Sequence, residues 1–260
     1  MAFAYNKSMR VKFEVEGSGP PLLLHHGLWG SMFSWVEQGY TEVLRENFTL
    51  ILMDARGHGD SDKPDDPHAY VLPVLVEDVI AVLTEMETDS VHFFGYDVGG
   101  RVGLGLARYV PERLKSLVVG SCGAVRPELT GLDKQIRALR AGTEMFISQI
   151  ESTKGVMIPE PRRSRELAND STALTAMLQA IRGTRDPGIE PILKDIKVPT
   201  MFYAGTEDPM HQQTKDAALK VPGSIFLSLP GADYYDGFER SGLILPQIKA
   251  FLAGAVEVDT

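Results

Sequence analysis

Short apolar runs alternate with longer amphipathic stretches along most of the chain. The runs lie at residues 21–26, 48–53, 90–94, 114–119, 200–204 and 224–229. Runs of this length without strict polar alternation are typical of strands buried on both faces of a parallel sheet. Between them, helical periodicity predicts helices at 72–84, 102–109, 211–220 and 243–252. This order predicts an α/β fold with right-handed crossovers, whose chemistry lies in loops at the carboxyl ends of the strands.

The segment 122–198 interrupts this alternation, because it offers only helical patterns, at 132–152, 162–182 and 189–197. We expect a helical cap inserted between two core strands. The domain prediction is therefore a core of residues 1–121 and 199–260 and a cap of residues 122–198. Methionine and leucine side chains of the cap either line an apolar pocket or, more commonly for such residues, pack against the sheet.

Composition narrows the class of protein. The chain has 260 residues, of which 43% are hydrophobic and 23% charged, as in a folded globular domain. The net charge of −9, with acids and bases interspersed, argues against nucleic acid as a partner. We find no signal peptide or membrane span, and the single Cys122 favours a reducing compartment. We expect a cytoplasmic protein, monomer or homodimer, that acts on a small molecule without membrane, metal or cofactor.

The strongest chemical signal is the segment 95–100, which reads Gly-Tyr-Asp-Val-Gly-Gly between a predicted strand and a predicted helix. A nucleophile elbow turns so sharply that small residues must flank its central residue, here Asp97. The turn would place the Asp97 carboxylate at a helix N-terminus, where negative charge is favoured. The alternative is an aspartate that caps an ordinary tight turn.

A second signal is the strand end at 22–31, where His26 and Gly27 begin a loop. The backbone N–H groups of Leu28 and Val98 are expected to form an oxyanion hole beside the elbow. The His26 ring is more plausibly bonded to loop backbone than catalytic. We expect His26, Trp29 and Tyr96 to line the substrate pocket, although Trp29 could instead pack beneath the cap.

A glycine-rich turn at 54–64 completes the pattern, and we interpret it as structural, His58 included. Together the His-Gly loop, the Asp-x-Arg-Gly-His-Gly-x-Ser turn, the elbow and a late Gly-Thr-Glu-Asp-Pro loop resemble the α/β-hydrolase superfamily, in its chain order. The resemblance implies an α/β-hydrolase fold with a helical cap. Members with aspartate at the elbow resemble dehalogenases and epoxide hydrolases, whose carboxylate attacks carbon and forms an ester. Members with serine there act on esters, lactones or carbon–carbon bonds.

The resemblance also places the remaining catalytic residues. It nominates Asp208, after the penultimate strand, as the acid, and it expects histidine where this chain has Tyr234, in the sequence Gly-Ala-Asp-Tyr at 231–234. A phenol with an ordinary pKa near 10 is a poor base at neutral pH, but a good hydrogen-bond donor. His211 is a possible substitute for the missing imidazole.

Three hypotheses follow. The first is a hydrolase of a small ester, lactone, epoxide or halide, with Asp97 as nucleophile or base. The second is a cofactor-independent lyase, isomerase, cyclase or decarboxylase in which Asp97 and Tyr234 form an acid–base pair. The third is an inactive, ligand-binding relative. We rank them in this order, and fold alone does not separate them.

Overall fold

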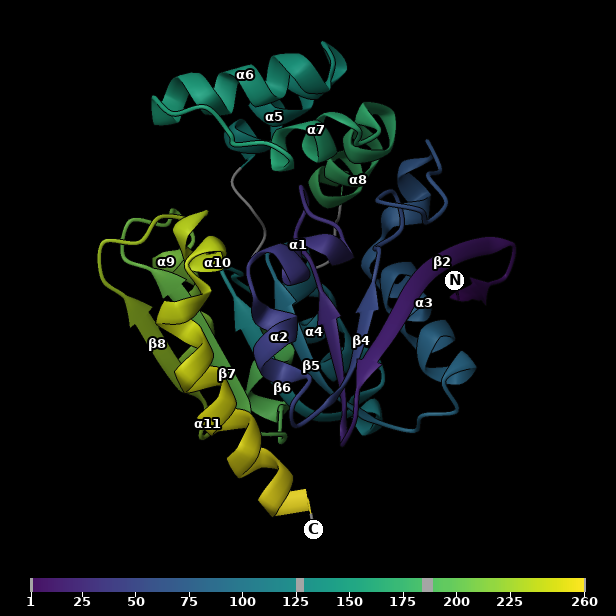
Figure 1. Ribbon diagram of the computed structural model, residues 1–260, viewed down its shortest axis with the longest axis vertical. Helices are drawn as coiled ribbons and strands as arrows, with labels where there is room; N and C mark the ends of the chain where they lie inside the picture. The colour runs from purple at the N-terminus through teal and green to yellow at the C-terminus, as the bar shows by residue number, and fades with distance from the viewer. Residues whose placement is uncertain (1, 125–128, 184–188, 260) are drawn as a thin grey trace.

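One mixed sheet forms the centre of the computed structural model, which describes residues 2–124, 129–183 and 189–259 (Figure 1). Within these ranges the sheet has eight strands: β1 (Ala2–Asn6), β2 (Met9–Gly17), β3 (Pro21–His25), β4 (Thr49–Met53), β5 (Val91–Tyr96), β6 (Leu114–Gly120), β7 (Thr200–Gly205) and β8 (Ile225–Leu229). Their order is β1-β2-β4-β3-β5-β6-β7-β8. β2 pairs antiparallel with β1 and β4, and the pairs from β4 through β8 are parallel. The predicted mostly parallel α/β fold is confirmed.

Apolar side chains cover both faces of the sheet because successive strand residues point to opposite sides. Leu23 of β3 belongs to one buried cluster, whereas Leu22 and Leu24 belong to the other. The first cluster packs against α3 (Leu72–Glu85), α4 (Val98–Tyr109) and α9 (His211–Ala218). The second packs against α1 (Met32–Glu37), α2 (Tyr40–Leu44) and α11 (Ser241–Asp259). The unalternating runs of the sequence are therefore strands buried on both sides.

The sequence pattern did not predict the first two strands of the structure. β1 and β2 form an antiparallel hairpin at the edge of the sheet, where half of each strand faces solvent. Mixed polar and apolar positions, with charges throughout 9–17, gave no buried run to detect. The hairpin pairs through β2 with β4 and extends the parallel part of the sheet.

Two long helices expected in the segment 122–198 are each divided. The pattern at 132–152 becomes α5 (Leu129–Arg140) and α6 (Thr143–Lys154), because Gly142 between them has φ of +112°. The pattern at 162–182 becomes α7 (Arg162–Leu167) and α8 (Ser171–Gly183), where the Asp170 carboxylate accepts hydrogen bonds from the first N–H groups of α8. The pattern at 189–197 is a 3₁₀ helix, η3 (Glu190–Asp195), rather than an α-helix.

Helices α5 to α8 lie together beyond one end of the sheet, above α1 in the view of Figure 1. α8 contacts the 3₁₀ helix η1 (Pro67–Tyr70) of the sheet-bearing part, and α5 packs on α8. The other short elements are η2 (Pro111–Arg113) and α10 (Asp236–Glu239). The boundaries of a separate cap stay a prediction. None of the helices in the described ranges combines the length and apolarity needed to cross a membrane.

A buried ion pair fixes the glycine-rich turn after β4. Arg56 Nε donates to Asp78 Oδ2 at 2.8 Å and its second guanidinium nitrogen to Oδ1 at 2.5 Å, and both side chains are at most 5% exposed. The Asn6 amide also donates to Asp78, at 2.8 Å, which connects β1 to α3. The turn at 54–64 is thus anchored to two other elements.

Replacement of Asp78 by alanine should lower the free energy of unfolding by about 3–5 kcal/mol, because it leaves the Arg56 charge buried and unpaired. The matched control is its neighbour, Glu77→Ala, which removes an exposed pair with Lys7 and should cost less than about 1 kcal/mol. Urea unfolding followed by tryptophan fluorescence measures both. Equal losses for the two variants would contradict this account of the turn.

Candidate active site

Asp97 lies in a strained turn between β5 and α4. Its backbone has φ of +53° and ψ of −116°, outside the favoured regions for a residue with a side chain. Two glycines make the turn possible: a methyl group on Gly95 would come within 2.3 Å of the Gly99 carbonyl, and one on Gly99 within 2.1 Å of the His25 carbonyl oxygen. The geometry expected of a nucleophile elbow is present.

The Asp97 carboxylate meets two of the predicted site residues. Its Oδ2 atom accepts a hydrogen bond from the Leu28 N–H at 3.0 Å and one from the Tyr234 hydroxyl at 2.9 Å. The Val98 N–H also stabilises the charged form of this carboxylate. Gly27 packs directly against the same oxygen, where a side chain would not fit. Residues from the loops after β3, β5 and β8 therefore converge on one carboxylate.

Burial controls the electrostatics of this pair. Desolvation raises the pKa of Asp97 above its ordinary value, although the hydrogen bonds from Leu28, Tyr234 and Val98 oppose the rise. Burial and the neighbouring Asp97 charge raise the pKa of Tyr234 well above 10. The proton therefore stays on the phenol at neutral pH, and the carboxylate is the acceptor.

Asp208, nominated as the catalytic acid, lies after β7 and is buried. Its Oδ1 accepts a hydrogen bond from the Met210 N–H at 2.8 Å. Burial raises the pKa of Asp208, which a hydrogen bond from the Ser121 hydroxyl opposes, and the Asp208 charge in turn raises the pKa of Asp97. The role of Asp208 remains a prediction.

The histidines of the His-Gly loop and of the following turn form hydrogen bonds with backbone groups. His26 donates through Nδ1 to the Gly27 carbonyl at 2.8 Å and accepts the Ala55 N–H at Nε2 at 3.0 Å. His58 bonds the Leu28 carbonyl at 2.6 Å. Burial lowers the pKa of both rings, so they are neutral at pH 7. They join the loop that carries the Leu28 N–H to the turn after β4.

None of the chain's six imidazoles has Asp97 among its described partners. His211, the possible substitute, bonds Ser228 of β8 at 2.8 Å. His92 bonds Ser116 at 2.8 Å, His68 is exposed, and burial lowers the pKa of His25 to about 4. An imidazole that could activate water at this carboxylate is missing from the described contacts.

A cavity of about 310 Å³ opens beside the Asp97–Tyr234 pair. Its lining includes the three residues predicted for the substrate pocket and Tyr234 itself: His26, Trp29, Tyr96 and Tyr234. Trp29 also stacks on Phe146 of α6 at 3.9 Å between ring centroids, so both alternatives for this residue hold at once. Asp97, Leu28 and Val98 are not part of this lining, whereas Tyr234, which donates to the Asp97 carboxylate, is.

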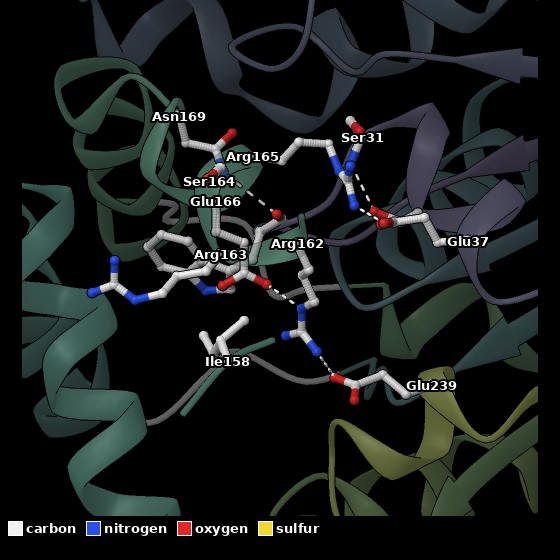
Figure 2. A network of polar contacts seen from close by, with 12 residues as sticks. Ser31, Glu37, Ile158, Arg162, Arg163, Ser164, Arg165, Glu166, Asn169 and Glu239 are labelled. Atoms are coloured by element: carbon white, nitrogen blue, oxygen red, sulfur yellow. Dashed lines mark hydrogen bonds and ion pairs between the residues drawn. The ribbon is translucent and has the colours of Figure 1, made fainter. Parts of the chain in front are cut away.

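Sequence reasoning missed the charged wall of this cavity, which α7 supplies. Arg162 pairs with Glu166 of the same helix and with Glu239 of α10, while Arg165 pairs with Glu37 of α1 (Figure 2). All five side chains line the cavity. The dense charge at 162–166 was the available signal, but a solvated helix face would give the same pattern.

Comparison with known proteins agrees with this geometry. Residues 20–143 match the family model described as alpha/beta hydrolase fold. The chain has the α/β-hydrolase fold. It is 26% identical to 3-oxoadipate enol-lactonase 2 of Acinetobacter baylyi over 74% of this chain and 72% of that protein. The putative 2-succinyl-6-hydroxy-2,4-cyclohexadiene-1-carboxylate synthase of Bacillus subtilis is 26% identical over 93% and 95% of the two chains.

Solved structures support the same α/β-hydrolase fold. A hydrolase from Pseudomonas aeruginosa PA01 superimposes with a TM-score of 0.86 and 24% identity over 96% of this chain and 97% of that one. Within the described ranges, the chain shows no group of three or more His, Cys, Asp or Glu residues arranged to hold a metal ion.

Because burial raises the folded-state pKa of Asp97 above its ordinary 3.8, ionisation of Asp97 costs stability. The wild type should lose stability relative to Asp97→Asn as the pH rises from about 3.8 through the folded pKa. Below about 3.8 both forms carry a neutral group, and the difference should be constant. Thermal unfolding of both proteins between pH 3 and 8 measures it. A difference that does not change with pH would contradict the buried, hydrogen-bonded carboxylate.

Proposed function

We propose that this α/β hydrolase moves a proton to or from a small organic molecule in the cavity, with Asp97 and Tyr234 as an acid–base pair. One observation carries the proposal: Tyr234 lines the cavity and at the same time donates its hydroxyl hydrogen to Asp97 Oδ2. The pair therefore connects bound substrate to a buried carboxylate.

The proton-transfer step balances within this pair. A C–H or O–H bond of the substrate breaks, and its proton goes to the Tyr234 oxygen as the phenolic proton passes to Asp97 Oδ2. The electron pair stays on the substrate, where a neighbouring carbonyl delocalises it. The concerted movement avoids a free phenolate, which burial disfavours. Return of the proton to another atom is an isomerisation, and loss of a leaving group is an elimination.

The same contacts argue against ester hydrolysis, which was the first of the three hypotheses. Resolution of an aspartyl ester needs a base that activates water, a contribution of about 10²–10⁴-fold. Five of the six imidazoles bond other groups, and His68 is exposed. In addition, the Leu28 N–H that would bind an oxyanion is already occupied by Asp97 Oδ2.

Hydrolysis through Asp97 is the second candidate, supported by the enol-lactonase relative and by the hydrogen bonds that fix Oδ2. A free carboxylate oxygen would attack an electrophilic carbon, the leaving group would depart, and water would cleave the ester.

The buried, unpaired Cys122 supports our further proposal that the protein works in the cytoplasm.

The test is exchange of acidic C–H hydrogens with D₂O, measured by proton NMR on acetophenones substituted at the 4-position. Wild type should accelerate exchange of the acetyl hydrogens, and Asp97→Asn and Tyr234→Phe should each lower the rate about 10²-fold or more. His211→Gln, at a histidine bonded to Ser228, should leave the rate unchanged.

Incubation with styrene oxide or 1-bromohexane addresses the second candidate in parallel. A mass increase of the intact protein that disappears in Asp97→Asn would establish Asp97 as a nucleophile and overturn the proton-transfer proposal. Absence of both exchange and adduct in a folded wild type would favour an inactive binding protein.

A further inference from the structure

Glu166 is a polar side chain of the cavity wall with incomplete hydrogen bonding. It lies on α7 and is 7% exposed, and its Oε1 accepts a hydrogen bond from Arg162 Nε at 2.6 Å. Its Oε2 is buried and has no hydrogen-bond partner in the described ranges. Burial raises the pKa of Glu166, which the Arg162 guanidinium opposes. A buried carboxylate oxygen without a donor destabilises the fold, and a ligand that supplies a donor would recover that loss.

The charges around this oxygen favour one class of ligand. Both arginines of the cavity lining are already neutralised: Arg162 by two glutamates and Arg165 by Glu37. Asp54 and Asp60 add acidic groups to the lining. Among the described lining residues, five acidic side chains face two arginines, so acidic groups are in excess. An anion would meet repulsion here, whereas a hydrogen-bond donor or a cation would not.

We propose that the cavity selects a small uncharged or cationic molecule with an O–H or N–H donor at the end remote from Tyr234, and that Glu166 Oε2 accepts that donor. The inference rests on the proposed function, because it assumes that the reacting group lies at Tyr234. Glu166 and Tyr234 come from different elements, α7 and the loop after β8, and both line the same cavity. Figure 2 shows the Glu166 side chain extending from α7 toward the Arg162 guanidinium.

Four acetophenones of similar length test the proposal: those with aminomethyl, hydroxymethyl, ethyl or carboxymethyl at the 4-position. Isothermal titration calorimetry of the wild type should show the aminomethyl and hydroxymethyl compounds binding about 10-fold more tightly than the ethyl compound. The carboxymethyl compound should bind most weakly.

Two variants distinguish the role of Glu166 as a hydrogen-bond acceptor from its ion pair with Arg162. Glu166→Leu should reduce the advantage of the two donor compounds to within about 2-fold, and should improve binding of the carboxymethyl compound because a negative charge is gone. Glu239→Gln removes the other glutamate partner of Arg162 but keeps the Glu166 acceptor, so the preference for donors should persist. Circular dichroism checks that both variants are folded.

The proposal is overturned if the four compounds bind equally or not at all, if the carboxymethyl compound binds best, or if folded Glu166→Leu keeps the wild-type order. Hydrogen exchange in the same samples reports on the proposed function separately. If the compounds bind in the predicted order but no hydrogen exchange occurs, the proton-transfer proposal is wrong and the proposed substrate class is supported. If exchange occurs but the compounds show no order of affinity, the proton-transfer proposal is supported and the substrate class is wrong.

Discussion

The close approach of the β3 loop to the elbow after β5 is the constraint on which the site depends. Gly99 packs so closely against the His25 carbonyl that a Cβ atom would not fit between them, and Gly27 packs against the Asp97 carboxylate. This contact brings the Leu28 N–H within 3.0 Å of Asp97 Oδ2. Without it, the buried carboxylate would lose a donor that stabilises its charge, and the Tyr234 hydroxyl and the Val98 N–H would remain.

Through the same contact, the Asp97 carboxylate occupies the Leu28 N–H that was expected to belong to an oxyanion hole. In a site with a shorter nucleophile, the Leu28 N–H would be free to bind a substrate oxygen. Here the longer aspartate side chain reaches the donor itself. The residue at the elbow thus decides whether the neighbouring N–H is free, and the function proposed above uses proton transfer through Tyr234 in place of oxyanion stabilisation.

Much of this could be predicted from the sequence, and the failures have physical causes. Buried strands such as 114–119 were recognised because both faces are apolar, and the elbow because its glycines are required by a positive φ at Asp97. The hairpin β1–β2 was missed because an edge strand is half solvent-exposed and carries charges. Helix breaks at Gly142 and Asp170 lay inside continuous apolar periodicity, which local pattern alone does not interrupt.

The role of the charged residues of α7 could not be predicted from the sequence. Arg162 and Arg165 pair with glutamates on α10 and α1, about 75 to 130 residues away in the chain, and Glu166 pairs with Arg162. From sequence alone these residues are a charged helix face; in the fold, two arginines are neutralised and one carboxylate oxygen remains unpaired. If the elbow carries the proposed chemistry, then the choice of substrate falls to these pairs. Variation among relatives in α7 should therefore alter which molecule binds while leaving the Asp97–Tyr234 contact intact.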